Sequence, residues 1–171
     1  MNIFLTGYRC TGKTSVGNAL AKDLNRPVLD ADAELVKECG MTIKEIVSKN
    51  GWEAFRKKEK NIMLKLCRLD KHVIATGGGV ILDPDNIKNM KKSGSVVWLR
   101  AKPDTIKKRI FKDANTQDQR PSLTPKGLEN EIEETLAVRN SLYEAAMDFF
   151  IDTDDMSVSE ICIKIKNKLF I

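Results

Sequence analysis

Short apolar segments alternate with longer amphipathic segments along the chain. The apolar segments are three to five residues long and contain β-branched side chains, which is typical of strands. They lie at Asn2–Thr6, 27–29, 72–75, 95–99 and 149–151. The sequence therefore predicts five β-strands.

The segments between these predicted strands have the apolar periodicity of helices. They lie at about 13–25, 33–39, 42–68, 83–92, 103–112, 126–147 and 157–170. Strands that alternate with helices are typical of right-handed crossovers and a parallel sheet. We therefore expect an α/β protein with three layers, α/β/α, around a five-stranded parallel sheet.

No internal repeat or low-complexity linker divides the 171 residues, and this length fits a single domain. Two segments look like additions to the sheet core. Residues 33–68 are helical without an intervening strand, and residues 113–125 are polar and bounded by proline. The second segment contains Arg120 and has the character of a lid over a phosphate, although a surface connection between two helices is the alternative.

The composition is that of an ordinary globular protein, with 42% hydrophobic and 31% charged residues. No apolar stretch approaches the roughly 20 residues of a membrane-spanning helix, and the first apolar run is too short for a signal peptide. We therefore expect a cytoplasmic protein without a membrane partner.

The net charge of +5 suits anionic ligands such as ATP. The lysines are spread over amphipathic stretches without interleaved aromatic residues, so we expect solvated faces and no nucleic-acid partner. The four cysteines are scattered without a CxxC pair, which indicates neither a zinc site nor a disulfide framework.

A phosphate-binding motif lies directly after the first predicted strand. Residues 7–14 match GxxxxGK[ST] in full and precede a predicted helix. In such a P-loop, glycines let backbone N–H groups point at phosphate oxygens beside a helix N-terminus. Lys13 is expected to reach the β- and γ-phosphates of ATP, and Thr14 to offer its hydroxyl to Mg²⁺. The expected nucleotide-binding residues of this segment are Gly7, Tyr8, Arg9, Cys10, Thr11, Gly12, Lys13, Thr14 and Ser15.

The usual acidic residue of motor ATPases and many GTPases is missing after the third predicted strand, where Thr76 and three glycines follow instead. The nearest carboxylates, Asp30 and Asp32, follow the second strand, and their spacing places them on the same side of an extended segment. We expect Asp30 to serve the outer shell of Mg²⁺ and Asp32 to orient the attacking hydroxyl or accept its proton. Alternatively, Asp32 is only the N-cap of helix 33–39.

Together, and in this order, these motifs resemble the shikimate kinase family, which has the nucleoside monophosphate kinase-like P-loop fold. The resemblance covers essentially the whole chain. The matching segments are 7–14, 30–32, 51–56 with Glu59, 76–79, 120–123, and Arg139 with Tyr143.

The resemblance implies transfer of the γ-phosphoryl of ATP, with Mg²⁺, to the 3-hydroxyl of shikimate in aromatic amino-acid biosynthesis. Shikimate carries a carboxylate and several hydroxyls, which suit planar arginine forks and carboxylate acceptors. By this resemblance Arg56 and Arg139 clamp the carboxylate, and Asp32 holds the reacting hydroxyl. Gly78 and Gly79 would let backbone N–H groups approach the ring.

The resemblance also assigns residues around this centre. Glu59 would orient the clamp arginine on its own helix, and Arg120 would close over the transferring phosphate like an arginine finger. Lys13, Asp32 and Arg120 would then be the catalytic set. On the adenine side we expect Arg109 to stack on the base and Thr153 to pack along it.

Two positions depart from the family pattern. Cys10 stands where the family usually has glycine, and Ser122 stands where it usually has leucine. Neither change removes a charged catalytic group. We expect Ser122 to affect the packing of the lid more than activity.

Alternatives remain open for the individual motifs. Arg56 with Glu59, and Arg139 with Tyr143, have the spacing of exposed helix pairs, and the three glycines could form only a turn. For the whole chain, the alternatives are another small-metabolite kinase of this fold, such as a gluconate kinase, or a nucleotide-binding regulatory module without transfer activity. We expect a monomeric enzyme with shikimate as its partner.

Overall fold

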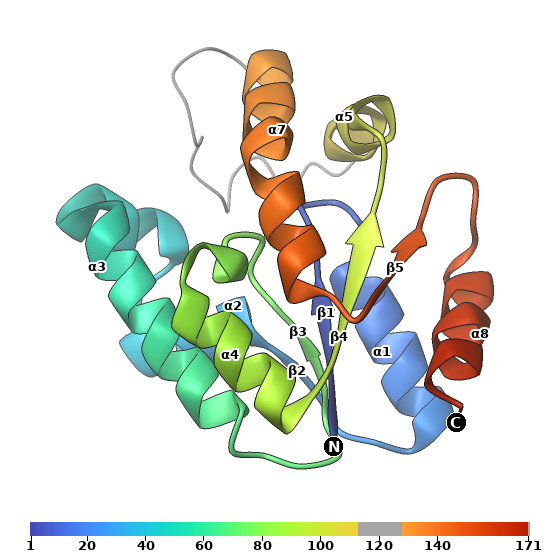
Figure 1. Ribbon diagram of the computed structural model, residues 1–171. Helices are drawn as coiled ribbons and strands as arrows, with labels where there is room; N and C mark the ends of the chain where they lie inside the picture. Colours follow the sequence, from blue (N-terminus) through green and yellow to red (C-terminus); the bar gives the residue numbers. More distant parts are fainter. Residues whose placement is uncertain (113–127, 171) are drawn as a thin grey trace.

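The computed structural model describes residues 1–112 and 128–170. The predicted lid 113–125, with Arg120 and Ser122, lies outside the described residues. Five strands form a single sheet in the order β2-β3-β1-β4-β5, with all neighbours parallel (Figure 1). Their bounds are β1 Asn2–Thr6, β2 Val28–Asp30, β3 Val73–Ala75, β4 Gly94–Arg100 and β5 Phe149–Asp152.

Helices connect the strands and cover both faces of the sheet. Their bounds are α1 Lys13–Leu24, α2 Ala31–Cys39, α3 Ile43–Leu66, the 3₁₀ turn η1 Val80–Leu82, α4 Pro84–Ser93, α5 Pro103–Lys112, α7 Leu128–Ala146 and α8 Val158–Leu169. The predicted α/β class with a five-stranded parallel sheet is therefore confirmed.

Alternate residues of the central strands face opposite layers, because successive strand side chains point to opposite sides. Phe4 and Trp98 pack with residues of α2, α3, α4 and α7. Leu5 and Leu99 pack instead with residues of α1 and α8. Figure 1 shows the corresponding layers, with α1 and α8 on one side of the sheet and α4 and α7 on the other.

A third, smaller cluster lies beyond the carboxyl end of the sheet. Tyr8, which follows β1, packs there with Ile106 and Ile110 of α5 and with Ile132 and Leu136 of α7. This cluster fixes both helices to the segment between β1 and α1.

The order of the strands determines where a ligand site can form. β1 and β3 are neighbours in the sheet, but the connection after β1 leads to β2 on one side of this pair and the connection after β3 leads to β4 on the other side. In open α/β sheets, ligands bind at the carboxyl ends of the strands at such a point. The P-loop after β1 and the glycines after β3 meet at this edge.

Two local predictions were wrong in detail. The helix expected over 42–68 is interrupted at Gly51, whose φ of 78° and ψ of 170° are not helical. The helix expected from residue 33 starts at Ala31, because Asp30 caps it: Asp30 Oδ1 accepts hydrogen bonds from the N–H groups of Asp32 and Ala33. Asp32 therefore lies in the first turn of α2 and not on an extended segment beside Asp30.

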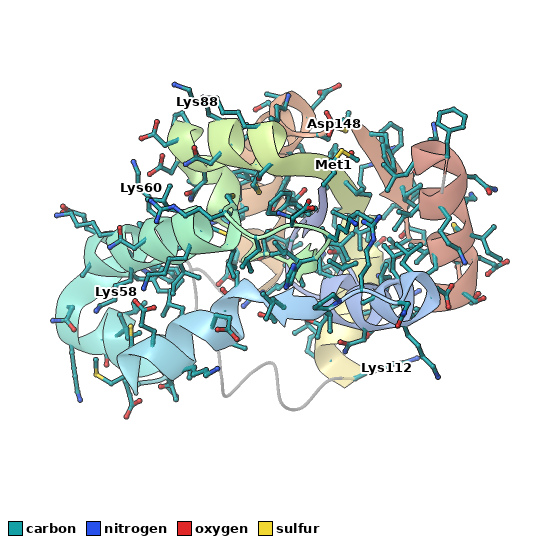
Figure 2. The ribbon with its side chains drawn as sticks, turned by 90° about the horizontal axis from the view of Figure 1, so that it is seen from below. Met1, Lys58, Lys60, Lys88, Lys112 and Asp148 are labelled. Carbon is teal, nitrogen blue, oxygen red and sulfur yellow. The ribbon has the colours of Figure 1, made fainter. Side chains whose placement is uncertain are left out.

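Charged side chains project from several elements. Lys88 of α4 and Lys112 of α5 point outward in the view from below (Figure 2), whereas Lys60 of α3 pairs with Asp85 of α4 at 2.6 Å. Within the described ranges, no helix is both long and apolar enough to cross a membrane.

Candidate active site

The P-loop makes a tight turn between β1 and α1. Gly7 has a φ of 140°, and a Cβ on it would overlap the carbonyl oxygen of Leu99 on β4. Gly12, with a φ of 94°, is the residue that precedes the first turn of α1. A side chain at Gly7 would displace the strand behind it, so the motif requires glycine there for close approach as well as for conformation.

Lys13 is folded back over the loop. Its Nζ donates to the carbonyl oxygens of Gly7 at 2.8 Å and Tyr8 at 2.7 Å, and the residue is buried. The Thr11 hydroxyl also donates to the Tyr8 carbonyl, at 2.8 Å. These contacts hold the lysine cation at the centre of the P-loop, where anionic phosphate oxygens would be attracted to it.

Cys10 adopts a left-handed backbone conformation, with a φ of 60°. Glycine adopts this conformation without strain, whereas other L-residues rarely do. A cysteine at position 10 is therefore more strained than the glycine that the family usually has there. The Cys10 carbonyl accepts a hydrogen bond from Arg109 Nη1 at 3.2 Å, which ties the turn to α5.

Thr14 and Asp30, the two residues expected at the metal, lie together. The Thr14 hydroxyl donates to Asp30 Oδ2 at 3.0 Å. A hydroxyl and a carboxylate are the hard oxygen donors that Mg²⁺ prefers, and Mg²⁺ is usually bound by one or two protein groups plus phosphates and water. No cluster of three or more His, Cys, Asp or Glu side chains that could hold a metal occurs in 1–112 or 128–170. The pair therefore fits a Mg²⁺ shared with the nucleotide phosphates.

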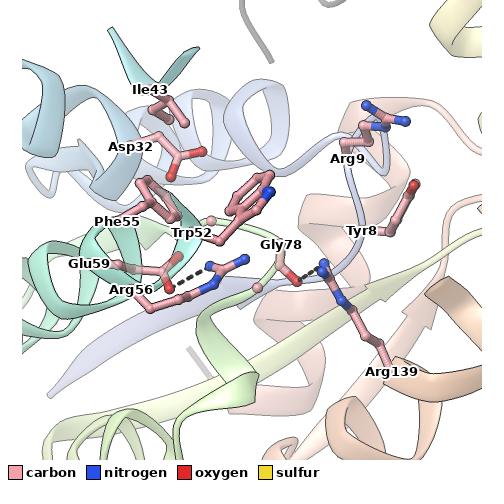
Figure 3. A pocket seen from close by; sticks show the side chains of 12 residues that line it. Tyr8, Arg9, Asp32, Ile43, Trp52, Phe55, Arg56, Glu59, Gly78 and Arg139 are labelled. Atoms are coloured by element: carbon pink, nitrogen blue, oxygen red, sulfur yellow. Dashed lines mark hydrogen bonds and ion pairs between the residues drawn. The ribbon is translucent and has the colours of Figure 1, made fainter. Parts of the chain in front are cut away.

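A pocket adjoins the P-loop and brings the predicted acceptor residues together (Figure 3). They come from four parts of the chain: α2, α3, the loop after β3, and α7. The residues that line the pocket are Tyr8, Arg9, Asp32, Ile43, Trp52, Phe55, Arg56, Glu59, Gly77, Gly78, Gly79 and Arg139. All five residues predicted to bind the substrate are in this set.

Arg56 is held inside this pocket by a carboxylate and two aromatic rings. Its Nη1 donates to Glu59 Oε2 at 2.7 Å, and the Glu59 side chain is only 5% exposed. The guanidinium carbon lies 5.5 Å from the ring centre of Trp52 and 5.0 Å from that of Phe55, within the range of cation–π attraction. Arg56 and Glu59 are therefore not the exposed helix pair that their spacing also allowed.

The interruption of α3 at Gly51 comes directly before Trp52, the residue that carries one of these rings.

Glu59 is largely buried, and burial raises the pKa of its carboxyl although the Arg56 guanidinium acts in the opposite direction. Its second oxygen, Oε1, has no hydrogen-bond partner among the described residues. The pocket thus contains a buried carboxylate oxygen available to a donor.

The three glycines after β3 make room for these side chains. A Cβ on Gly79 would overlap the guanidinium of Arg56. A Cβ on Gly77 would come within 2.7 Å of Asp32 Oδ1 and 2.8 Å of Glu59 Oε1. Gly77 was not predicted as a site residue, although its place in the run of three glycines could have indicated that it lies at the site.

Arg139 and Tyr143 fix the middle glycine from the opposite side of the pocket. Arg139 Nη1 donates to the Gly78 carbonyl oxygen at 3.2 Å, and the Tyr143 hydroxyl donates to the same oxygen. Tyr143 is fully buried and stacks on Trp98 of β4, with ring centres 5.5 Å apart. The exposed-pair alternative for these two residues is therefore wrong, and Tyr143 gains a positioning contact that the sequence did not predict.

The residues expected beside adenine, Arg109 and Thr153, contact each other. Arg109 donates to the Thr153 hydroxyl at 3.0 Å and to its carbonyl at 2.6 Å. Thr153 is buried, and its hydroxyl also donates to the carbonyl of Arg100 at 3.1 Å. The structure thus links the two elements expected around the base, and the adenine contacts themselves stay a prediction.

The chain matches known proteins over nearly its full length. The model of the shikimate kinase family matches residues 9–170. The shikimate kinase of Caldanaerobacter subterraneus subsp. tengcongensis is 43% identical over 160 residues, which cover 94% of this chain and 91% of that protein. The shikimate kinase of Syntrophus aciditrophicus is 40% identical over 168 residues, with coverage of 94% and 86%.

Solved structures agree with this match. A shikimate kinase from Acinetobacter baumannii in complex with shikimate has a TM-score of 0.92 and 31% identity, covering 99% of this chain and 92% of that one. A shikimate kinase from Bacteroides thetaiotaomicron has a TM-score of 0.91 and 29% identity, covering 100% and 99%. Because the family model, the relatives and the fold agree along the chain, it belongs to the shikimate kinase family, whose members are ATP-dependent kinases.

Proposed function

We propose that this kinase transfers the γ-phosphoryl of ATP to the 3-hydroxyl of shikimate across the boundary between the P-loop and the adjoining pocket. The observation that carries the proposal is that two arginines and a carboxylate line one pocket against the P-loop. They are Arg56, Arg139 and Asp32. The acceptor pocket and the P-loop are in close contact, because a Cβ on Gly78 would lie 3.3 Å from the Gly7 carbonyl oxygen.

The acceptor's carboxylate binds between the two arginines in this proposal. Each guanidinium already has one fixed contact, Arg56 with Glu59 and Arg139 with the Gly78 carbonyl. Arginine carries five N–H donors, so each keeps further donors for a carboxylate. Because both forks are held before the ligand arrives, less side-chain freedom is lost on binding.

Asp32 orients the 3-hydroxyl and accepts its proton as the phosphoryl group arrives. It lines the acceptor pocket and also lies beside the Thr14 and Asp30 pair, in a second depression of the surface. A carboxylate placed between an acceptor pocket and a phosphate site can serve as a general base. Glu59 supports this arrangement by holding Arg56.

The donor half of the site consists of the P-loop and the pair formed by Thr14 and Asp30. Lys13 exchanges its contacts with the Gly7 and Tyr8 carbonyls for the β- and γ-phosphate oxygens. Thr14 and Asp30 would together hold Mg²⁺. When bound, the Mg²⁺ offsets the negative charge that donor and transition state share. Arg120 and the lid, outside the described residues, stay predictions of the same scheme.

The alternative acceptor, gluconate, also carries a carboxylate and hydroxyls, but family membership and the glycine-lined pocket favour shikimate. A regulatory module without activity is disfavoured, because Lys13, Asp32 and Arg120 are all present. The monomeric state, the cytoplasmic location and the absence of a nucleic-acid partner remain predictions from the sequence.

A coupled assay of ADP release tests the proposed acceptor. With Mg-ATP, shikimate should give turnover far above that with gluconate or with no acceptor. Phosphorus–proton coupling in the product's NMR spectrum should place the phosphate on the 3-hydroxyl. Equal slow ADP release in all three reactions, or phosphate on another hydroxyl, would refute the proposal.

A further inference from the structure

Helix α7 contacts both halves of the site. Its first turns pack Ile132 against Tyr8 of the P-loop. Further along, Arg139 and Tyr143 donate to the carbonyl of Gly78 beside the acceptor pocket. One continuous helix therefore contacts the nucleotide-binding loop with its first half and the acceptor-binding loop with its second.

A buried ion pair strengthens the first of these contacts. Arg9, the third residue of the P-loop, donates through Nη2 to Glu131 Oε1 of α7. The two side chains are only 10% and 1% exposed. Figure 3 shows the Arg9 guanidinium turned away from Asp32 and Arg56, so it does not take part in the cluster of charges inside the pocket.

This ion pair is better explained by positioning than by stability. Burying two charges costs much of what their attraction returns, so such pairs contribute little net stability. In addition, Arg9 Nε has no hydrogen-bond partner among the described residues. Because separation of the P-loop from α7 would take the buried Arg9 guanidinium away from its carboxylate partner Glu131, the pair strongly disfavours that separation.

The contacts form a closed ring. Arg9 binds Glu131, α7 carries Arg139, Arg139 binds the Gly78 carbonyl, and Gly78 lies against the P-loop. A Cβ on Gly78 would be 3.6 Å from the backbone nitrogen of Arg9 and 3.3 Å from the carbonyl oxygen of Gly7. A shift of the P-loop on binding phosphates would therefore reach Arg139 along α7 as well as through the Gly78 loop.

We infer that Arg9 and Glu131 are positioning residues that couple nucleotide binding to acceptor binding. The inference rests on the proposed function, since it takes Arg139 and the Gly78 loop as part of the shikimate site. Neither side chain needs to touch the reacting atoms. Their contribution is to keep the P-loop and α7 in one arrangement, so that the nucleotide-bound loop places Arg139 correctly for the acceptor.

Titration calorimetry of the full chain tests this coupling. The dissociation constant of shikimate is measured without nucleotide and with saturating Mg-ADP, which permits no turnover. In the wild type we expect ADP to tighten shikimate binding by about 5-fold or more. In Glu131→Gln the effect of ADP should fall below about 2-fold, while shikimate binding without nucleotide changes little.

The matched control is Glu133→Gln on the same helix. Glu133 pairs with Lys107 of α5 at 3.2 Å, but its side chain is 62% exposed. This variant should keep the wild-type response to ADP. If Glu131→Gln fails to fold, Glu131→Asp replaces it, because it keeps the buried charge and shortens the side chain that holds Arg9.

The possible results separate the inference from the function on which it rests. An undiminished ADP effect in Glu131→Gln, or in Glu131→Asp where that replaces it, would overturn the coupling role. So would a loss of shikimate affinity that is equal with and without ADP, because that pattern indicates only a structural role. A wild-type chain that binds shikimate without any ADP effect would also overturn the inference. One that binds no shikimate would refute the proposed function first, and the inference with it.

Discussion

Arg56 and Glu59 form an ion pair of 2.7 Å within the pocket, and the glycine at position 79 is what leaves room for the Arg56 guanidinium. This relationship joins two motifs that are separate in the sequence, one on α3 and one after β3. It makes the acceptor pocket sensitive to small changes in the glycine loop that leave the P-loop untouched.

Substitution of Gly79 by alanine should therefore impair acceptor binding selectively. The new Cβ would overlap the Arg56 guanidinium and force it from its position beside Glu59. We expect the KM for shikimate to rise roughly 10-fold or more, since a charge-assisted contact is lost, with the KM for ATP nearly unchanged. Steady-state kinetics with each substrate varied in turn measures both values.

Gly17→Ala is the matched control. A Cβ there would make ordinary contacts, the nearest being 3.5 Å from Leu5 Cδ1. It should leave the KM for shikimate unchanged. An equal rise in both KM values for Gly79→Ala would show that the glycine serves the whole site and not the acceptor arginine.

Removal of the Arg139 side chain should weaken shikimate binding far more than ATP binding. The arginine lines the acceptor pocket, and a charged hydrogen bond to a carboxylate contributes roughly 10- to 100-fold in affinity. Calorimetry of Arg139→Ala with shikimate and with Mg-ADP provides the two dissociation constants. The reverse pattern, with nucleotide binding lost and shikimate binding kept, is incompatible with the assigned role.

The left-handed backbone at Cys10 predicts an order of stability among substitutions there. Cys10→Gly should raise the free energy of unfolding by about 1 kcal/mol or less, because relief of strain is partly offset by greater freedom in the unfolded chain. Cys10→Val should be less stable than Cys10→Ala, because a β-branched side chain tolerates this conformation poorly. Urea denaturation ranks the three variants, and a valine variant as stable as the alanine one would contradict the strain at this position.

Burial of Glu59 predicts a pH dependence of stability. Burial raises the pKa of Glu59 above its ordinary value of 4.5, so the folded chain holds this proton more tightly than the unfolded chain. The contribution of Glu59 to the free energy of unfolding is then fully present below pH 4.5 and is lost as the pH rises through the raised pKa.

The difference in unfolding free energy between the wild type and Glu59→Gln isolates this contribution. Both free energies are measured by denaturant titration at a series of pH values upward from about 4. As the pH rises, the unfolding free energy of the wild type should fall relative to that of Glu59→Gln. A difference that stays constant, or that shifts toward the wild type, would show that Glu59 titrates at or below its ordinary pKa.

Much of the fold followed from local patterns. The five strands and the parallel sheet were predictable because each strand is a short apolar segment between amphipathic helices. The break of α3 at Gly51 was not, since the apolar periodicity continues through it and only the φ of 78° reveals the turn. The order of the strands depends on contacts between segments distant in sequence, on which local periodicity carries no information.

The residues of the site also divide into those that the sequence could indicate and those that it could not. Lys13 could be singled out because it lies in a motif with a defined chemistry, whereas Arg56 and Arg139 were assigned by resemblance to the shikimate kinase family. The Asp30 cap on α2 was missed, because a capping aspartate and a metal-binding one look alike in sequence. Glu131 gave no signal either, since it lies in an ordinary amphipathic helix and its proposed role depends on its burial against the P-loop.

The most direct test of the central claim, that the pocket beside the P-loop is where the acceptor receives the phosphoryl group, is the turnover of Asp32→Asn. This change keeps the shape of the side chain and removes the base that lines the pocket. We predict that kcat with shikimate falls by roughly 10²- to 10⁴-fold, while the dissociation constant of Mg-ADP stays within about 2-fold of the wild type. A variant that retains the wild-type kcat would contradict this account of the site.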